Sequence, residues 1–268
     1  MAITSGDLYI ASAKQIVPFT KTGSVTAVSL TRFGTFAAAG TPTAGTLAMT
    51  TALTGAVPDD TVAGYPLLNA FGGAATGYLT RVQYNSSVTG RLELWDKLFG
   101  INVSLTALAT TTLSGQISYS GRIPNSSYAG LRIFMEVTTA VSNTATTVTV
   151  TYTNQSGATG RTTVTSSAMN SFTASRWIEF TLQAGDYGVQ KIESVIVGGT
   201  VATAGAVNIM VMRPLWSNRV NIANGGGLDG IDRTGMPIVF ATSALTLTCI
   251  PDATATGVPD LNLEIANG

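Results

Sequence analysis

The sequence predicts an all-β fold, an antiparallel β-sandwich of the jelly-roll type with extended N- and C-terminal segments. Apolar and polar side chains alternate with a period of two along many short runs, which is the spacing of a strand with one buried and one solvated face. The connections between these runs contain Gly, Asn, Ser or Pro, and no run shows the period of an amphipathic helix. About eight strands of this kind fit the two sheets of a sandwich.

The clearest strands lie within residues 131–164. Over 131–138, Leu, Ile, Met and Val occupy alternate positions. Over 147–153, Val and Tyr alternate with Thr, whose branched side chain suits the outer face of a strand. The segment 154–157, Asn-Gln-Ser-Gly, is a turn sequence, and a short strand at 161–164 follows it. These runs predict consecutive antiparallel strands.

Further runs complete the predicted body, and they cover residues 78–84, 90–99, 176–182, 189–197 and 207–212. The sandwich body is therefore placed at residues 76–213, between an N-terminal arm with docking loops at 1–75 and a C-terminal extension at 214–268. The extension ends in an alternating strand at 261–265, which we expect to pair with the N-terminal region. Near the start of the chain, residues 7–17 fit either a short helix or a strand.

A loop at residues 64–73 carries several large apolar side chains. A free loop seldom exposes such side chains, so this loop either tucks beneath the sheet or docks onto a partner. We expect partner contacts in this loop and at one tryptophan of the C-terminal extension. The predicted contact residues are Tyr65, Leu67, Leu68, Phe71 and Trp216.

The composition is unusually poor in charge. Only 10% of the 268 residues are charged, against about 25% in typical soluble proteins, and the mean hydropathy is +0.31. No apolar run approaches the roughly 18 residues of a membrane-spanning helix, so we expect no membrane partner. A surface rich in Thr, Ser and Gly would explain the missing charge, and so would burial against other subunits. We favour burial, because the cores of protein interfaces are depleted in charged residues.

Several classes of function are excluded by what the sequence lacks. The 14 basic and 14 acidic residues form no basic stripe, which argues against a nucleic-acid partner. Without histidine there is no Ser-His-Asp or Cys-His machinery and no histidine-ligated metal. The single Cys249 cannot form an intrachain disulfide or a thiolate metal cage, and phosphate-binding motifs are missing. We therefore expect a protein that is not an enzyme and uses no cofactor. The first residues have neither a charged nor an apolar region, so no signal peptide is expected.

Two features that suggest ligands have plainer explanations. The glycine loop at 224–232 offers two carboxylates, but calcium needs more oxygen ligands than two side chains supply, so we expect no metal there. The three tryptophans, Trp95, Trp177 and Trp216, could form a platform on which sugars stack. Tryptophans more often anchor a core or an interface, and we favour that role.

Acidic residues on predicted strands could also be taken for a glycosidase pair. We instead expect them to balance arginines on neighbouring strands. The acidic residues are Glu93, Asp96, Glu136 and Glu179, and the arginines are Arg91, Arg132 and Arg176.

Six segments distributed along nearly the whole chain carry a resemblance to a known family. They are 67–81 (LLNAFGGAATGYLTR), 91–99 (RLELWDKLF), 150–163 (VTYTNQSGATGRTT), 182–194 (LQAGDYGVQKIES), 211–216 (VMRPLW) and 259–268 (PDLNLEIANG). As a set they resemble a family of tailed-bacteriophage virion proteins. None of them is a catalytic signature, and the resemblance transfers no binding residue to this chain.

The resemblance implies a head-associated protein, a decoration or cement protein that binds the outer surface of a phage head and stabilises it. Its partners would be the major capsid protein and further copies of itself in a homotrimer. It would be made in the host cytoplasm and reside on the exterior of the virion head. Many identical weak contacts would then add through multivalency and symmetry.

Two further expectations follow. The first 45 residues would serve as a capsid-binding arm, without which the sandwich still folds. The rival function is a receptor- or carbohydrate-binding module of a phage spike or fibre, which would use exposed aromatic side chains.

Overall fold

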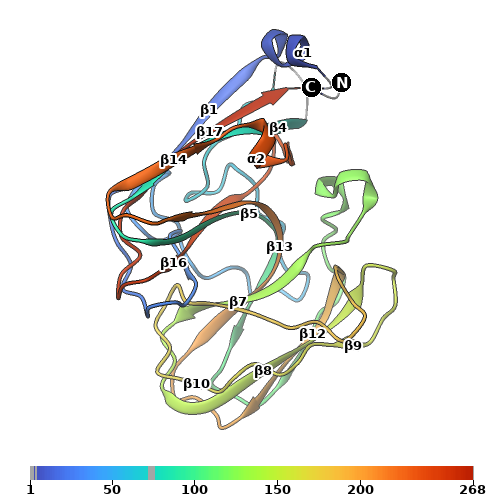
Figure 1. The fold of residues 1–268 in the computed structure, drawn as a ribbon. Coiled ribbons are helices and arrows are strands. Elements are labelled where there is room, and N and C mark those ends of the chain that lie inside the picture. The colour runs from blue at the N-terminus through green and yellow to red at the C-terminus, as the bar shows by residue number, and fades with distance from the viewer. Residues whose placement is uncertain (1–2, 4, 72–75, 268) are drawn as a thin grey trace. The chain divides into compact units, whose positions relative to one another are not determined.

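The computed structural model describes residue 3, residues 5–71 and residues 76–267. Over these residues the chain is almost entirely antiparallel β-structure, which confirms the predicted all-β class (Figure 1). The short helical elements are α1 (Gly6–Ala11), α2 (Ile231–Thr234) and the 3-10 turns η1 (Ser120–Arg122) and η2 (Pro124–Ser126). Within the described part of the chain, no helix has the length and apolar character needed to cross a membrane.

Strands make up most of the regular structure of the chain. They are β1 (Lys14–Lys21), β2 (Phe33–Gly34), β3 (Gly40–Thr41), β4 (Thr76–Ser86), β5 (Gly90–Ser104), β6 (Thr110–Thr112), β7 (Arg132–Thr139), β8 (Asn143–Asn154), β9 (Arg161–Thr162), β10 (Met169–Asn170), β11 (Trp177–Glu179), β12 (Val189–Gly199), β13 (Ala206–Val220), β14 (Gly225–Asp229), β15 (Ile238–Phe240), β16 (Leu245–Pro251) and β17 (Pro259–Asn267).

The chain forms two compact units. Unit 1 comprises Met1–Thr46, Asp59–Asp96 and Leu215–Gly268, and unit 2 comprises Leu47–Pro58 and Lys97–Pro214. The borders fall inside the two longest strands, so β5 and β13 each give one half to unit 1 and the other half to unit 2. Each unit has a hydrophobic core of its own.

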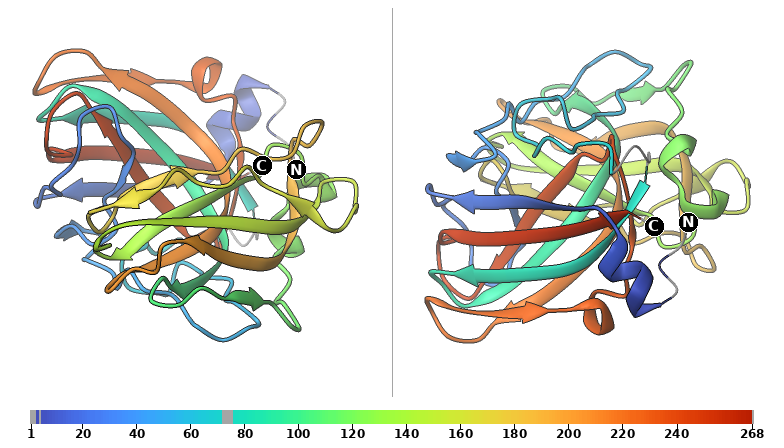
Figure 2. Two further views of the ribbon diagram at one scale, coloured as in Figure 1. Left: turned by 90° about the horizontal axis from the view of Figure 1, so that it is seen from below. Right: turned by 90° about the horizontal axis from the view of Figure 1, so that it is seen from above.

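Unit 1 contains a sheet with the strand order β14-β4-β17-β1-β3. The right-hand view of Figure 2 shows blue β1, red β17 and teal β4 side by side. Strand β17 pairs with β1 on one side, where Phe19 is opposite Leu261, and with β4 on the other, where Val82 is opposite Leu263. The predicted pairing of the C-terminal strand with the N-terminal region is therefore confirmed.

The core of unit 1 lies between this sheet and strands that include β16, which pairs with the first half of β5 and with β2. Alternate residues of each strand point into the core, as the period of two predicts. The core side chains from the strands include Val17, Phe19, Leu79, Val82, Leu92, Leu94, Leu245, Leu247, Leu261, Leu263 and Ile265.

Unit 2 is also built from two sets of paired strands. One sheet has the order β10-β8-β12-β6 with β9 paired to β8, and β7 pairs with β11 on one side and with β13 on the other. The predicted alternation places Val148, Val150 and Tyr152 of β8 in the core. The run at 176–182 gives only the three-residue strand β11, although the backbone N–H of Phe180 still donates to the carbonyl oxygen of Ile133 in β7 at 2.9 Å. Further core side chains are Leu98, Phe99, Ile101, Ile133, Met135, Val137, Ile192, Val195, Val207, Ile209 and Val211.

The ends of the chain are not arms outside a body. Strand β1 supplies Val17 and Phe19, which are 1% and 2% exposed, to the core of unit 1. The prediction that residues 1–45 form an arm separate from the folded body therefore does not match the structure. Likewise, the segment after residue 213 continues strand β13 and adds further strands to unit 1, so the units follow other borders than 75 and 213. A pattern of alternation marks strands, but it does not give the borders of the units into which they assemble.

The packing of β1 leads to a first prediction. Replacing the buried Phe19 by Ala leaves a cavity in the core of unit 1 and should lower the free energy of unfolding by about 3–5 kcal/mol. The matched control is Ile16→Ala on the outer face of the same strand, where the side chain is 52% exposed, and there we expect a change within about 0.5 kcal/mol. Urea unfolding measures both values, and equal losses in the two variants would refute the assigned faces of β1.

Candidate functional site

The structure buries four of the five predicted contact residues. Tyr65, Leu68, Phe71 and Trp216 are each less than a tenth exposed, and three of them belong to the core of unit 1. Tyr65 instead packs on the ring of Phe36, with a centroid distance of 4.7 Å. The loop therefore tucks its large side chains into unit 1, which is the first of the two alternatives. Leu67 is the exception, because its side chain is 64% exposed.

The three tryptophans are buried, so they do not form an exposed platform for sugars. Each indole nitrogen donates a hydrogen bond to a buried acceptor. Trp95 Nε1 donates to Thr248 Oγ1 at 3.0 Å, Trp177 Nε1 to Glu136 Oε1 at 2.9 Å, and Trp216 Nε1 to Asp229 Oδ2 at 2.8 Å. Their role as core anchors is the one that the structure supports.

The glycine loop at 224–232 uses its buried carboxylate for the fold. Asp229 Oδ2 accepts hydrogen bonds from Trp216 Nε1 and from Asn218 Nδ2, both at 2.8 Å. Among the residues that the structure describes, no group of three or more His, Cys, Asp or Glu side chains is arranged to hold a metal ion.

The predicted ion pairs are partly correct. Arg132 Nη1 and Glu179 Oε1 lie 3.1 Å apart across β7 and β11, as expected. Glu93 pairs with Arg32 at 2.6 Å instead of with Arg91, and Glu136 lies beside Lys97 instead of beside an arginine. Both true partners are distant in sequence, and alternation alone gives no signal for them.

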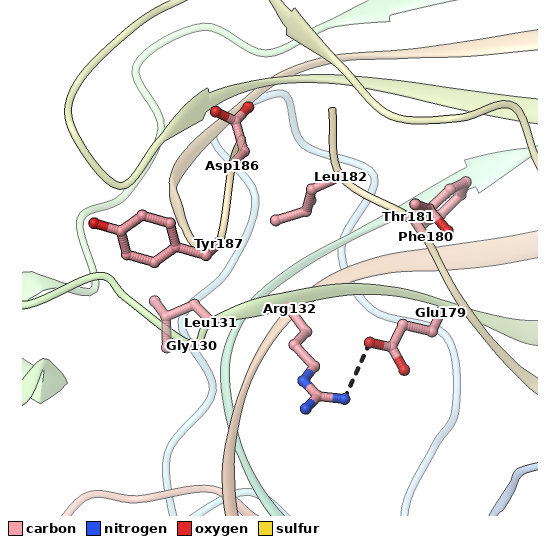
Figure 3. Close-up of a pocket in the computed structure, with 9 residues that line it drawn as sticks. All are labelled: Gly130, Leu131, Arg132, Glu179, Phe180, Thr181, Leu182, Asp186 and Tyr187. Atoms are coloured by element: carbon pink, nitrogen blue, oxygen red, sulfur yellow. Dashed lines mark hydrogen bonds and ion pairs between the residues drawn. The ribbon is translucent and has the colours of Figure 1, made fainter. Parts of the chain in front are cut away.

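An open hollow of about 560 Å³ lies on unit 2, and sequence reasoning did not find it (Figure 3). Its walls come from the start of β7, the end of β11 with the residues after it, and the turn before β12. The backbone N–H of Gly130 donates to the carbonyl oxygen of Tyr187 at 2.7 Å and joins two of these segments. The lining residues are Gly130, Leu131, Arg132, Glu179, Phe180, Thr181, Leu182, Asp186 and Tyr187.

The hollow combines an apolar base with a polar rim. Leu131 and Phe180 are buried, whereas the ring of Tyr187 is 63% exposed. Figure 3 shows Tyr187 and the Arg132–Glu179 ion pair on different sides of the hollow. Aromatic faces, guanidinium donors and carboxylate acceptors suit a small neutral polar group, such as a sugar ring or part of a peptide. The tyrosine in the glycine-bracketed turn at 184–188 is the one feature of the sequence that could have indicated this site.

Asp186 fixes the turn that carries Tyr187. Its carboxylate accepts hydrogen bonds from Arg161 Nε at 2.9 Å, from Asn154 Nδ2 at 2.7 Å and from the Tyr152 hydroxyl at 2.7 Å. The hydrogen bond from Arg161, foremost, lowers the pKa of Asp186 to about 2. Burial, foremost, and the hydrogen bond to Asp186 raise the pKa of Tyr152 to about 12. The carboxylate therefore stays ionised and serves the turn.

Comparisons with known proteins give little further guidance. No protein-family model and no curated protein matches the chain. Among solved structures, the chain is similar to the VP2 subviral particle of infectious bursal disease virus, with a TM-score of 0.24 and 9% identity over 99% of this chain and 82% of that one. A structure of the Gt strain of the same virus gives a TM-score of 0.18 and 10% identity over 99% and 83% of the two chains. TM-scores this low do not establish a common fold, and we draw no functional conclusion from them.

The network around Asp186 gives a second prediction. Because its pKa is about 2 in the folded chain against an ordinary 3.8, the ionised carboxylate stabilises the fold above pH 3.8, and this contribution is lost as the pH falls toward 2. Asp186→Asn should therefore lower the free energy of unfolding by about 2 kcal/mol at neutral pH, and the difference from the original chain should shrink in acid.

The control for this prediction is Asp252→Asn. Asp252 pairs with the half-exposed Arg219 at 2.7 Å on the surface, and such pairs contribute about 0–1 kcal/mol. Urea unfolding at several pH values compares the variants. A loss at Asp186 that does not change between neutral pH and acid would contradict the assigned network.

Proposed function

We propose that this protein is a structural, non-enzymatic subunit of a virus particle, and more specifically a decoration or cement protein on the outer surface of a tailed-phage head. Its partners in this proposal are the major capsid protein and further copies of itself, assembled as a homotrimer. The phage assignment rests on the resemblance of the six segments described above. The composition of the folded surface supports the subunit role.

The observation that carries the proposal is that the surface is poor in charge and carries as many large apolar side chains as charged ones. Ten of the 28 charged side chains are buried, which leaves 18 outside the cores. Among the residues that the structure describes, an equal number of large apolar side chains, 18, are exposed. Interface cores are depleted in charge in this way, whereas the surfaces of free monomers carry more of it. The buried charged residues are Lys21, Asp60, Glu93, Asp96, Lys97, Arg122, Glu136, Arg213, Asp229 and Glu264.

Within unit 1, helix α1 is the clearest candidate for a contact with a partner. None of its residues is buried, and Ile10 is 75% exposed. A helix that contributes nothing to the core of its own unit is free to pack on another subunit. Leu67 lies in the loop that contacts β1, because Asn69 N donates to Gln15 Oε1 at 3.1 Å. Contact through Leu67 thus remains part of the proposal, whereas the other four predicted residues serve the core.

The proposal is tested on particles. Phage heads lacking this protein are incubated with the purified full chain, sedimented and imaged by electron microscopy, and the oligomeric state of the free protein is measured by light scattering. We expect regular density on the head exterior and a trimer in solution. A monomer that binds neither heads nor any other part of the virion would overturn the proposal.

A second candidate function is favoured by the hollow of unit 2. Its exposed Tyr187 and the nearby ion pair fit a saccharide, as in a receptor-binding module of a spike or fibre. A glycan array separates the two functions, since a pure cement protein should bind no sugar. If a sugar binds, Tyr187→Ala should abolish the signal and the cement role should be dropped.

The contact at Leu67 gives a third prediction. Leu67→Ser removes an exposed apolar side chain and should weaken binding to heads about tenfold or more per site, with the free energy of unfolding changed by less than about 0.5 kcal/mol. The matched control is Asn69→Ser in the same loop, which should bind normally. Quantitative sedimentation over a range of protein concentrations measures both, and unchanged binding of the Leu67 variant would remove this residue from the interface.

A further inference from the structure

Unit 2 buries a lysine, a glutamate and an asparagine against one another. Lys97 is 1% exposed, and Glu136 and Asn208 are 0% exposed. Glu136 of β7 and Asn208 of β13 are directly opposite in the sheet, and Lys97 comes from β5, the next strand beyond β13. Lys97 Nζ lies 3.6 Å from Glu136 Oε2, and Asn208 Nδ2 donates to the same oxygen at 3.0 Å. One carboxylate oxygen therefore contacts both an amine and an amide nitrogen.

The carbonyl group of Asn208 is polarised by two donors. Asn208 Oδ1 accepts a hydrogen bond from the backbone N–H of Met49 at 3.0 Å and another from Asn102 Nδ2 at 3.0 Å. Two N–H groups aimed at one carbonyl oxygen make its carbon more electrophilic. They also stabilise the negative charge that develops on the oxygen when a nucleophile adds to the carbon. Asn208 is thus held as an activated amide.

Burial of all three side chains favours a neutral amine and a neutral carboxylic acid. Trp177 acts in the opposite sense, because its Nε1 donates to the other oxygen of Glu136 at 2.9 Å and its ring lies 5.8 Å from Lys97 Nζ, and both contacts suit the charged forms. Two charged groups are costly in a buried site that excludes solvent. Transfer of a proton from the amine to the carboxylate replaces two charged groups by two neutral ones and produces the nucleophilic form of lysine.

We propose that Lys97 and Asn208 form an isopeptide bond within the chain, with Glu136 as the proton-transfer group. Starting from the neutral amine and the carboxylic acid, Nζ attacks Cγ of Asn208, and the electron pair of the carbonyl bond moves to Oδ1. Glu136 takes a proton from Nζ and gives one to Nδ2. The carbonyl bond re-forms, the Cγ–Nδ2 bond breaks, and ammonia leaves.

The reaction balances without any other reactant. A primary amine and a primary amide give a secondary amide and ammonia, so neither an oxidant nor a cofactor takes part. The new bond would tie β5 to β13 inside unit 2. The inference rests on the contacts of these side chains and does not depend on the proposed function.

The mass of the purified full chain tests the proposal directly. We expect a mass lower than that of the sequence by one ammonia molecule. Trypsin should not cleave after the modified Lys97, nor after Arg213, which precedes Pro214. Tandem mass spectrometry should therefore find the peptide 92–122 joined to the peptide 192–219. A full sequence mass overturns the proposal, and so does an ammonia loss without joined peptides, such as a succinimide at Asn224-Gly225 would give.

Variants separate the roles of the three groups. Lys97→Arg keeps the positive charge but removes the amine nucleophile, and Glu136→Gln removes the proton-transfer group, so both should have the full sequence mass. The matched control is Lys21→Arg, because Lys21 is a second buried lysine whose amine donates to the carbonyl oxygens of Ala38 and Pro42 at 3.2 and 2.8 Å. It should keep the ammonia loss. A joined peptide that persists in the Lys97 variant would overturn the assignment, and the measurement on the original chain decides the case even where a variant fails to fold.

Discussion

The need to satisfy charged side chains that are hidden from solvent is the constraint on which the rest of this structure depends. An ionised side chain in a protein interior costs several kcal/mol unless a partner and hydrogen bonds compensate it. In unit 1, Glu93 accepts two hydrogen bonds from Arg32 and one from Thr248. In unit 2, Asp186 accepts from Arg161, Asn154 and Tyr152. Each of these carboxylates joins segments that are far apart in the sequence, and so it fixes which segments lie together.

The same constraint shapes the surface. A chain with 10% charged residues that places ten of its 28 charged side chains in the interior has few left for solvent. Solubility then depends on Thr, Ser, Gly and amide groups, and exposed aliphatic side chains become a large share of what a partner meets. Single exposed aliphatic residues are ordinary. The proposed assembly in a particle rests on their number relative to the remaining charges.

Sequence patterns determine the strands well and their assembly poorly. The alternation at 131–138 and 147–153 locates β7 and β8, because a period of two depends only on local sequence. It predicts that the C-terminal strand pairs with the N-terminal region, as β17 does with β1, but it gives no sign that both strands supply side chains to the core of unit 1. Because the alternation does not show which strands share a core, the sequence predicts terminal segments outside the body. It also assigns to a partner four apolar side chains that unit 1 buries.

The hollow of unit 2 could not be predicted from the sequence either, because its walls come from three separate stretches of chain that only the folded structure brings together. The ion pair of Arg132 and Glu179 is an exception, since the sequence predicts that these acids balance arginines on neighbouring strands. Both residues lie on strands that the alternation marks, and those strands are neighbours, so the rule that opposite charges pair across strands was sufficient.

The buried carboxylates of Glu93 and Glu136 differ in a way that bears on the chemistry of unit 2. Arg32 holds Glu93 with two hydrogen bonds of 2.6 and 3.1 Å, the geometry that makes arginine the preferred partner for a buried carboxylate. Glu136 instead lies beside a lysine amine at 3.6 Å, well beyond the roughly 2.7–2.9 Å of a strong charged hydrogen bond. An arrangement optimised only for stability would resemble the first pair. The second brings an amine and an activated amide to one carboxylate oxygen, which a reaction between them requires and a simple ion pair does not.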